Sequence, residues 1–373
     1  MAGLNLFREP FDEGTMRKLY LYRHYVEAWL PVFLHQSLDR IQIFDFFAGQ
    51  GNDKDGKPGS PLIALQQIRS ARDSYFKATP PPPVHLYLNE YKKCNFDHLC
   101  GVCDACEDKG NATVHYSNKD FRVVFKEWLP LMRERNVANL VFLDQNGVKF
   151  ITPEVFRSIT SIARTDFLFY ISSSHINRFK DDPNIVGNTP VTDDDLAKMN
   201  GKNVHRIVRD AYRRILPDPS NYYLASFSIK KGGNVFGLIF GSGHPLGMEK
   251  FLNLAWKVDP LTGEADYDID DDGIIIGQPS LFEEFNKPTK KKKFNSTFRN
   301  AVLNGDLKTT RDAYLYTLKE GFPPEEARIV VSQMMAEGLI AKRRYTISYD
   351  NSYKDALKIV DIVLTDKGKG VRR

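Results

Sequence analysis

Three carboxylates, each placed after a short apolar run, are the residues most able to do chemistry. Asp45 begins a turn of small residues, Glu90 follows a second apolar run, and Asp144 ends a third. A carboxylate can accept hydrogen bonds from ligand hydroxyls, or a proton from a reacting amine. Small residues such as Gly49 and Gly51 let the backbone approach a ligand closely. These patterns indicate a nucleotide-like ligand bound where strands end.

Apolar runs that alternate with helical patterns must position these carboxylates. The predicted strands lie at residues 41–47, 84–88, 113–116, 140–144 and 167–171. Such alternation is typical of a parallel sheet. Residues 222–229 and 235–240 then indicate a hairpin. The sequence therefore predicts an α/β protein with a Rossmann-like, mostly parallel sheet and an antiparallel last strand.

The order of the motifs favours S-adenosylmethionine (SAM) over a dinucleotide. A dinucleotide site would want Gly-x-Gly-x-x-Gly, whereas Gly49 and Gly51 are followed by Lys54. SAM instead needs a glycine turn near its methionine end, an acid at its ribose and side chains beside its adenine. The residues expected to contact SAM are Asp45, Phe47, Ala48, Gly49, Gly51, Ser60, Glu90, Asp120 and Phe121. Asp144 and Asn146 would face the methyl group, where Asp144 could orient an acceptor or accept its proton.

All the cysteines of the chain are close together in sequence, at Cys94, Cys100, Cys103 and Cys106. Disulfides are rare in the cytosol, so this density points to a metal. Two overlapping Cys-x-x-Cys steps would bring thiolates close enough for one tetrahedral zinc ion. The sequence predicts a zinc-binding insertion at residues 91–110. A four-thiolate iron–sulfur cluster, or no metal, is the alternative.

The C-terminal part of the chain is basic, although the whole chain has a formal net charge of only +5. Residues 287–373 contain 19 Lys or Arg against 10 Asp or Glu. Helical patterns at 295–304, 309–320 and 323–337, followed by a wing at 342–349, predict a winged helix-turn-helix. The expected nucleic-acid contacts are Lys290, Lys291, Lys292, Lys293, Arg328, Lys342, Arg343 and Arg344. A solvated basic face, or a module that docks a protein or its own body, is the alternative.

Four motifs occur in one order along the chain, namely Asp45-Phe-Phe-Ala-Gly-Gln-Gly, Gly59-Ser-Pro-Leu, Phe142-Leu-Asp-x-x-Gly and Gly241-Ser-Gly-His-Pro. Through them, roughly residues 15–345 resemble the three-Cys-motif partner proteins (TcmP). The resemblance implies a SAM-methyltransferase-like body with a helical C-terminal module. It also implies a companion protein that resembles radical-SAM enzymes. That companion carries the three cysteines of the family name, so they are not equated with those of this chain.

These observations predict a domain organisation and a compartment. Residues 1–286 form the SAM-methyltransferase-like domain, with a Cys-rich insertion at 91–110 and a helical insertion at 176–218. Residues 287–294 form a basic linker, and residues 295–373 form the winged-helix domain. The sequence has no apolar stretch of about 18 residues and no apolar signal core. We therefore expect a cytoplasmic protein with no membrane partner.

Asp144-Gln-Asn-Gly also resembles the Asp-Pro-Phe-Gly motif of tRNA guanine dimethyltransferases, which methylate an exocyclic base amine. That motif presents a backbone carbonyl through a rigid proline turn. Here Gln145 takes the place of the proline, and Asn146 could supply a side-chain carbonyl instead.

Two hypotheses follow from these residues. The leading one is a SAM-dependent methyltransferase that acts on the amine of a flipped or single-stranded nucleic-acid base. The rival is a catalytically altered SAM-fold scaffold that recruits nucleic acid for its companion, in a phage-defence or mobile-element setting. A small-molecule methyltransferase and a nuclease-like defence component are more distant alternatives.

Overall fold

The computed structural model describes residues 10–75, 80–145, 150–171, 188–200, 202–219, 221–232, 234–270 and 288–371. The chain divides into two compact units, residues 1–250 and 251–373. Each unit is described by itself.

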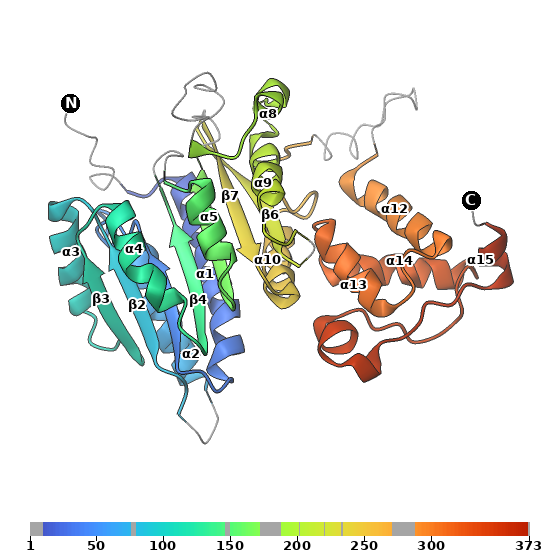
Figure 1. The fold of residues 1–373 in the computed structure, drawn as a ribbon, viewed down its shortest axis with the longest axis horizontal. Helices are drawn as coiled ribbons and strands as arrows, with labels where there is room; N and C mark the ends of the chain where they lie inside the picture. The colour runs from blue at the N-terminus through green and yellow to red at the C-terminus, as the bar shows by residue number, and fades with distance from the viewer. Residues whose placement is uncertain are drawn as a thin grey trace. The chain divides into compact units, whose positions relative to one another are not determined.

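A seven-stranded sheet forms the centre of the N-terminal unit (Figure 1), in the order β3-β2-β1-β4-β5-β7-β6. The strands are β1 (Arg40–Asp45), β2 (Val84–Asn89), β3 (Ala112–Ser117), β4 (Val137–Leu143), β5 (Thr165–Ile171), β6 (Tyr223–Lys231) and β7 (Asn234–Ser242). The pairs among β1 to β5 are parallel, whereas β7 is antiparallel to both β5 and β6. The predicted mostly parallel sheet with an antiparallel last strand is confirmed.

Burial on both faces explains the sequence of the central strands. Every residue of β4 and of β5 is buried, and β1 is buried from Ile41 to Asp45. A parallel strand covered by helices on both faces has no solvent side, so its sequence is a nearly continuous apolar run.

Helices cover both faces of this sheet. They are α1 (Glu13–Leu34), α2 (Ser60–Asp73), α3 (Lys93–Asp104), α4 (Phe121–Met132), α5 (Pro153–Thr160), α8 (Asp193–Lys198), α9 (Val204–Arg214) and α10 (Pro245–Val258). In Figure 1, α4, α5 and α9 lie in front of the sheet, and α1 and α2 lie behind it. Capping residues fix several helix starts: Asp120 caps α4, and Thr152 with Pro153 begins α5.

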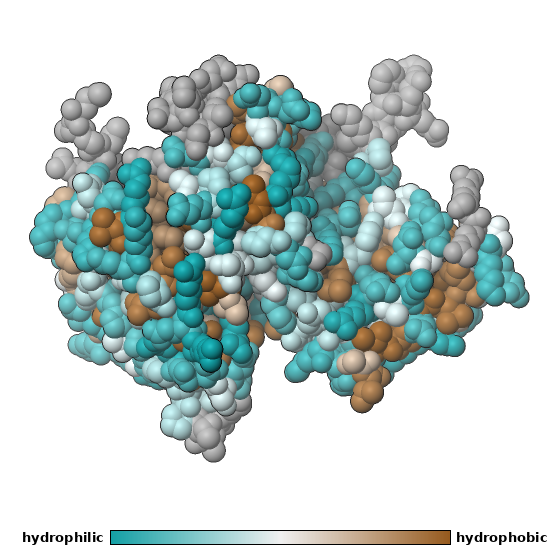
Figure 2. Space-filling view, in the orientation of Figure 1, coloured by the Kyte–Doolittle hydropathy of each residue, from teal (hydrophilic) through white to brown (hydrophobic). Residues whose placement is uncertain are grey.

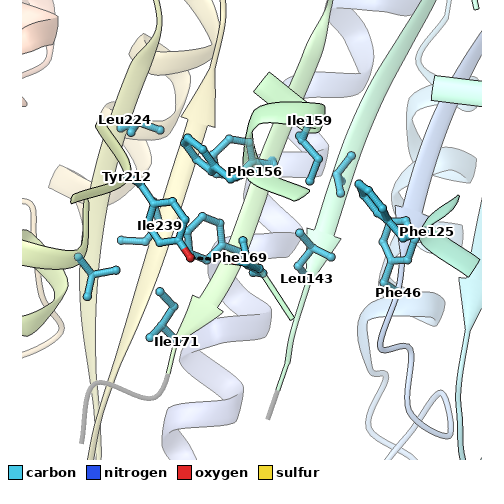
Figure 3. Packing of buried hydrophobic residues seen from close by; sticks show 14 of the residues in the cluster. Phe46, Phe125, Leu143, Phe156, Ile159, Phe169, Ile171, Tyr212, Leu224 and Ile239 are labelled. Carbon is cyan, nitrogen blue, oxygen red and sulfur yellow. Dashed lines mark hydrogen bonds between the residues drawn. The ribbon is translucent and has the colours of Figure 1, made fainter. Parts of the chain in front are cut away.

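One hydrophobic cluster joins the sheet to α4, α5 and α9 (Figure 3). Phe46 and Leu143 from the strands pack with Phe125 of α4, Phe156 of α5 and Tyr212 of α9. All five side chains are buried, and Tyr212 donates its hydroxyl to the carbonyl of Ile151. The cluster therefore fixes the strand ends from which the loops of this unit begin.

The described parts of the two segments predicted as insertions are helical. Residues 91–110 contain α3, which connects β2 to β3. Within residues 176–218, α9 packs its buried residues into the same cluster as α4 and α5. Residues 172–187 lie outside the described part of the chain.

The C-terminal unit is built on a three-helix group. Its elements are α12 (Lys290–Asn304), α13 (Thr310–Lys319), α14 (Pro324–Ala336), a π-helix η2 (Asp350–Lys354), a 3₁₀ turn η3 (Ala356–Lys358) and α15 (Asp366–Gly370). Thr289 caps α12 through the amide of Lys292. Residues 290–294 of the segment predicted as a basic linker therefore begin a helix.

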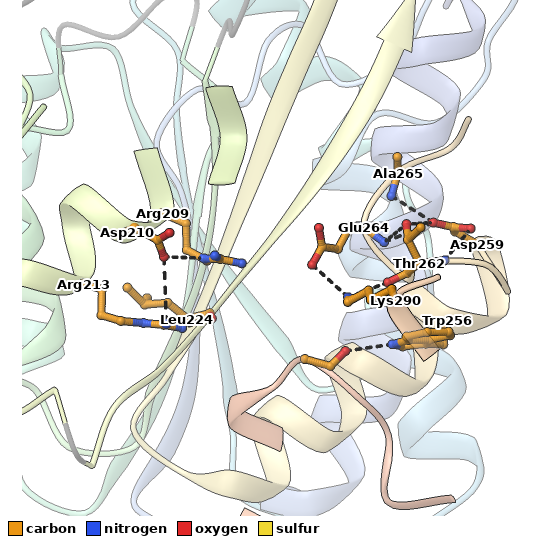
Figure 4. Close-up of polar contacts among 11 residues, drawn as sticks. Arg209, Asp210, Arg213, Leu224, Trp256, Asp259, Thr262, Glu264, Ala265 and Lys290 are labelled. Carbon is orange, nitrogen blue, oxygen red and sulfur yellow. Dashed lines mark hydrogen bonds and ion pairs between the residues drawn. The ribbon is translucent and has the colours of Figure 1, made fainter. Parts of the chain in front are cut away.

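Polar contacts attach residues 256–265 to these helices, as Figure 4 shows. The Lys290 ammonium donates to the Glu264 carboxylate at 2.8 Å and to the Thr262 carbonyl at 2.6 Å. Its Nζ lies 5.3 Å from the centre of the Trp256 ring, and the Trp256 indole donates to the Gly321 carbonyl at 2.9 Å. These contacts are consistent with a compact unit that begins at residue 251, upstream of the predicted boundary.

The predicted wing at residues 342–349 is wrong in its pairing, because this described stretch contains no strand. The chain instead bridges Ile340 to Leu364 and Thr309 to Asp361, both antiparallel. The amide of Ala341 donates to the Val363 carbonyl at 2.8 Å. The chain therefore pairs back through isolated bridges at Asp361 and Leu364, and the winged-helix assignment stays a prediction.

The surface of the C-terminal unit combines polar residues with apolar ones. Figure 2 shows hydrophobic residues at several places on its visible face, and its large exposed apolar side chains are Ile329, Leu357, Val363 and Val371. Among the described helices of the whole chain, none has the length and apolar character needed to cross a membrane.

We expect Gly241→Ala to destabilise the N-terminal unit. Gly241 of β7 is opposite Phe167 of β5, and an added Cβ would lie 2.2 Å from the Phe167 ring. Because Phe167 is buried, either the ring or the strand must move, at a cost of about 1–3 kcal/mol. Urea unfolding measures this change.

The matched control is Gly243→Ala, whose added Cβ would meet its nearest atom, in Tyr222, at an ordinary 3.6 Å. Equal unfolding free energies for the two variants would contradict the packing described at β5 and β7.

Candidate functional site

A cavity of about 710 Å³ lies where β1, β2, β4 and β5 end. The strand order reverses between β1 and β4, and in such sheets ligands bind beyond the carboxyl ends at this point. Because β7 runs antiparallel, its start and the end of β6 also reach the cavity, with Ile229, Lys231 and Phe236. All the lining residues belong to the N-terminal unit.

The glycine turn after β1 is tied to the end of β2. Gly49 has φ +65°, which a residue with a Cβ adopts only with strain. Its amide donates to Glu90 Oε2 at 3.1 Å, and the amide of Ala48 donates to the Asn89 carbonyl at 2.9 Å. Ala48 and Gly49 both line the cavity, as predicted for cofactor contacts.

Asp45 supports this turn from beneath and does not line the cavity. It is fully buried, and it accepts the Ser60 hydroxyl at 2.6 Å and the Phe47 amide at 3.2 Å. Burial raises the pKa of Asp45 to about 7, although both hydrogen bonds oppose the rise, and the nearby Asp144 and Glu90 carboxylates add to it. Asp45 was predicted to contact the cofactor directly, but it lies behind the residues that line the cavity. Two of those lining residues, Ser60 and Phe47, are its hydrogen-bond partners.

Gly51 lines the cavity and also makes room for α3. At φ +94°, an added Cβ would lie 2.5 Å from Val102 of that helix. The carbonyl of Gly51 accepts the Gly59 amide at 2.8 Å, which closes the loop before α2. A requirement of packing thus explains this glycine as well as any ligand contact does.

Glu90 is half-buried, with both carboxylate oxygens on backbone amides. Oε2 accepts from Gly49 and Oε1 accepts from Lys92 at 2.8 Å. Burial raises the pKa of Glu90 above its usual range, and these hydrogen bonds hold the rise back. The Asn95 side chain also lies within hydrogen-bonding reach of this carboxylate. A carboxylate has about four lone-pair positions, so about one stays available for a ligand hydroxyl.

Aromatic rings form the wall beside Glu90. Phe121 stacks on Phe47 with ring centres 5.3 Å apart and planes at 17°, and it also contacts Phe150. Asp120 caps α4 through the Arg122 amide at 2.9 Å and lines the same wall. Phe121 and Asp120 therefore both line the cavity, and their contact with a cofactor stays a prediction.

Asp144 lines the opposite part of the cavity, where its Oδ2 forms an ion pair with Lys18 of α1. The Lys18 ammonium also lies 5.2 Å from the centre of the Tyr170 ring. Asn146, the other residue predicted at the acceptor, lies outside the described residues.

Gln145 was missed as a site residue, although the altered motif drew attention to it. Its side chain is only 4% exposed, lines the cavity and accepts the Phe150 amide at 3.0 Å through Oε1. Among the described residues, its buried Nε2 has no hydrogen-bond partner. A buried donor without a partner lowers stability by about 1–3 kcal/mol. Such groups are rare in folded proteins, and some of them have a functional role.

Lys18, Lys231 and Tyr91 were also missed. Lys18 and Lys231 reach the cavity from α1 and β6, and Tyr91 lies at its edge with 70% of its surface exposed. No sequence motif marks the two lysines, since only the folded chain brings them to the strand ends. Tyr91 had a signal, because it directly follows Glu90.

The structure does not support the predicted zinc site. Cys94, Cys100 and Cys103 lie on α3, and Cys106 follows it. At 100° per residue, Cys94 and Cys103 fall on opposite sides of the helix: Cys94 is exposed and Cys103 is buried. Burial raises the pKa of Cys103 to about 12. Within the described chain, no three His, Cys, Asp or Glu side chains form a group that could hold a metal ion.

The residues predicted to contact nucleic acid differ in how they are engaged. Lys290 pairs with Glu264, and Lys291 pairs with Glu326 at 2.9 Å. Arg328 donates to the Ile347 carbonyl at 3.5 Å. The remaining predicted contacts are exposed, and they are Lys292, Lys293, Lys342, Arg343 and Arg344.

No protein-family model matches the chain, and no curated protein matches it. Among solved structures 52 chains match. The family resemblance therefore stays a prediction.

Three of the solved structures illustrate these matches. A Legionella pneumophila protein of the family model DUF519 is 13% identical, covers 61% of this chain and 86% of its own, and has a TM-score of 0.37. A SAM-dependent methyltransferase from Agrobacterium tumefaciens is 8% identical, covers 63% of this chain and 64% of its own, and has a TM-score of 0.34. A methyltransferase from Geobacter sulfurreducens is 10% identical, covers 62% of this chain and 80% of its own, and has a TM-score of 0.29. Because all three TM-scores are below 0.5, these likenesses carry no argument about function.

The raised pKa of Asp45 predicts how stability depends on pH. The pKa of Asp45 is about 7 in the folded protein, whereas an unfolded aspartate titrates near about 4. The protonated form therefore contributes stability that is complete below about pH 4 and is lost as the pH rises through about 7. Asn at position 45 stays neutral at every pH. As the pH rises through this range, we therefore expect the unfolding free energy of Asp45→Asn to increase relative to that of wild type by up to about 4 kcal/mol.

Asp53→Asn is the control for this pH series. Burial acts to raise the pKa of Asp53, but hydrogen bonds from the Phe11 and Lys57 amides lower it below its usual range. Its difference from wild type should therefore be constant between about pH 5 and 7. A constant difference for Asp45→Asn as well would contradict the assigned environment of Asp45.

Proposed function

We propose that the N-terminal unit binds SAM and transfers its methyl group to an exocyclic amine of a nucleic-acid base. The observation that carries this proposal is the acidic character of the cavity, which Glu90 and Asp144 line and beneath which Asp45 is buried. Asp45, Glu90 and Asp144 lie near enough for the last two to raise the pKa of the first. Such a group of carboxylates favours a cationic ligand, and SAM carries a sulfonium and an ammonium.

The rest of the cavity fits the other parts of SAM. The remaining lone-pair capacity of Glu90 suits a ribose hydroxyl, and the Gly49 turn lets backbone lie close to the methionine end. Phe121 and Asp120 offer a ring face and a polar group for adenine, with Tyr91 at the edge. Its volume of about 710 Å³ is within the usual range for small-molecule sites.

When bound, SAM supplies a methyl group on a positively charged sulfur. The sulfur–methyl bond breaks during transfer, and its electron pair stays on the sulfur, which becomes neutral. The acceptor nitrogen uses its lone pair for the new bond and then loses a proton. Asp144 is the residue suited to hold that nitrogen, because its Oδ1 has no hydrogen bond from the described residues. An N–H held on this oxygen directs the lone pair elsewhere, and the carboxylate can accept the proton afterwards.

The C-terminal unit supports nucleic acid as the substrate class. Its exposed Lys342, Arg343 and Arg344 follow one another without acidic neighbours in sequence. Clustered basic residues bind phosphates by releasing counterions. A base within a duplex cannot enter a cavity at a sheet edge, so the target would be flipped or single-stranded. A radical-SAM-like companion remains a proposal based only on the resemblance.

One observation favours the rival function, a SAM-binding scaffold without transfer. The Lys18 ammonium takes one oxygen of Asp144, so the acceptor position is partly engaged by the protein itself. Gln145 in place of the proline of the related motif points the same way. A methyl-transfer assay on the wild-type protein separates the two functions.

Calorimetry with SAM tests the cofactor. We expect Glu90→Ala to weaken SAM binding by about tenfold or more, because both the ribose acceptor and the tie to Gly49 are lost. Glu127→Ala, which removes a surface carboxylate paired with Lys119, is the matched control and should bind like wild type. S-adenosylhomocysteine, which lacks the sulfonium charge, should bind more weakly than SAM. Absence of SAM binding to the wild-type protein would contradict the proposal.

Salt titrations with single-stranded RNA and DNA test the substrate class. We expect replacement of Lys342, Arg343 and Arg344 by Ala to weaken binding and to lower the slope of log K against log salt by about 2. The control replaces Lys126, Arg133 and Arg135, which carry the same charge on the N-terminal unit. An unchanged slope in the first variant would remove these three residues from the interface.

A further inference from the structure

The N-terminal segment of the chain forms one wall of the cavity. Its lining residues are Pro10, Phe11, Asp12, Gly14, Thr15, Lys18 and Leu19. The segment precedes the first strand, so no strand–helix motif predicts that it reaches the carboxyl ends of the sheet. Its place there must come from specific contacts.

Three polar contacts attach this segment across the cavity. The Phe11 amide donates to Asp53 at 2.9 Å, in the loop that follows the glycine turn. Asp12 forms an ion pair with Lys231 of β6 at 2.7 Å. Lys18 forms its ion pair with Asp144 after β4. The wall is thus joined to the cofactor side, to the hairpin and to the acceptor side.

Lys18 is held by its backbone as well as by its side chain. The Tyr170 hydroxyl donates to the Lys18 carbonyl at 3.2 Å, and the ring of the same tyrosine faces the ammonium. Because Tyr170 is buried, this contact sets where the lysine can extend. The side chains of Lys18 and Asp144 are 19% and 27% exposed, so water competes only partly for their pairing.

We propose that Lys18 is a positioning residue for Asp144. It takes Oδ2 and leaves Oδ1 directed to an acceptor N–H in the cavity. Without it, Asp144 turns freely in a half-open site and the acceptor is held less well. This inference rests on the proposed methyl transfer, and Lys18 itself does not touch the reacting atoms.

The test compares full-length variants with SAM saturating and total tRNA, rRNA and denatured DNA as acceptors. Lys18→Met should bind SAM like wild type but lower kcat by about tenfold to a hundredfold, the cost of a misplaced group. Lys18→Arg, which keeps the charge, should restore most of the rate. Asp144→Asn should lower the rate too, and the double variant should lose little more than either alone.

Lys231→Met is the matched control, because it removes the other cavity lysine and its pair with Asp12. It should lower the rate much less than Lys18→Met does. A second measurement needs no acceptor: after reductive ¹³C-methylation, the NMR signal of Lys18 should shift in Asp144→Asn and not in Asp12→Asn. The signal of Lys231 should do the reverse.

A wild-type or increased rate in Lys18→Met would overturn this inference, since an increase would mean that Lys18 blocks the acceptor. Additive losses in the double variant, or a Lys18 signal that ignores Asp144→Asn, would overturn it as well. No methyl transfer by the wild-type protein that binds SAM would overturn the proposed transfer and this inference together. Activity of the wild-type protein thus separates the two claims: if wild type transfers methyl groups, a wild-type rate in Lys18→Met overturns only the role of Lys18.

Discussion

Parallel pairing of β1 with β2 and β4 is the constraint on which the site depends. Asp45 is level with Leu88 of β2 and with Phe142 of β4 in the strand registers. Glu90 and Asp144 each come two residues after those partners, so register alone brings three carboxylates to one edge. The mutual repulsion of carboxylates is costly, and it accounts for the partners that this structure supplies: Ser60 for Asp45, backbone amides for Glu90 and Lys18 for Asp144.

The parts of the site that could be predicted from sequence are those within one strand–turn–helix unit. The residues from Phe47 to Gly51, together with Ser60, follow from a local pattern of apolar run, small turn and helix start. Glu90 and Asp144 could be predicted because parallel strands share an edge. Asp45 shows the limit of such reasoning, since a carboxylate at a strand end can support the turn from below without touching the cavity.

What sequence could not provide is pairing over long separations. Lys18 pairs with Asp144, which is 126 positions away in sequence, and no local sequence pattern around either residue predicts this contact. The cysteines show a different limit: their spacing suits a metal loop, but a regular helix turns Cys94 away from Cys103. In the C-terminal unit, the wing was predicted at residues 342–349, whereas the bridges to Thr309 and Ile340 come from Asp361 and Leu364, after the turns η2 and η3.

The central claim is that SAM occupies this cavity with its ribose at Glu90 and its sulfur toward Asp144. A crystal structure of the full-length protein with S-adenosylhomocysteine tests it most directly. The account predicts ligand density between the Gly49 turn and Phe121, with a ribose hydroxyl on the Glu90 carboxylate. Clear ligand density elsewhere on the protein, with this cavity holding only water, would contradict the account.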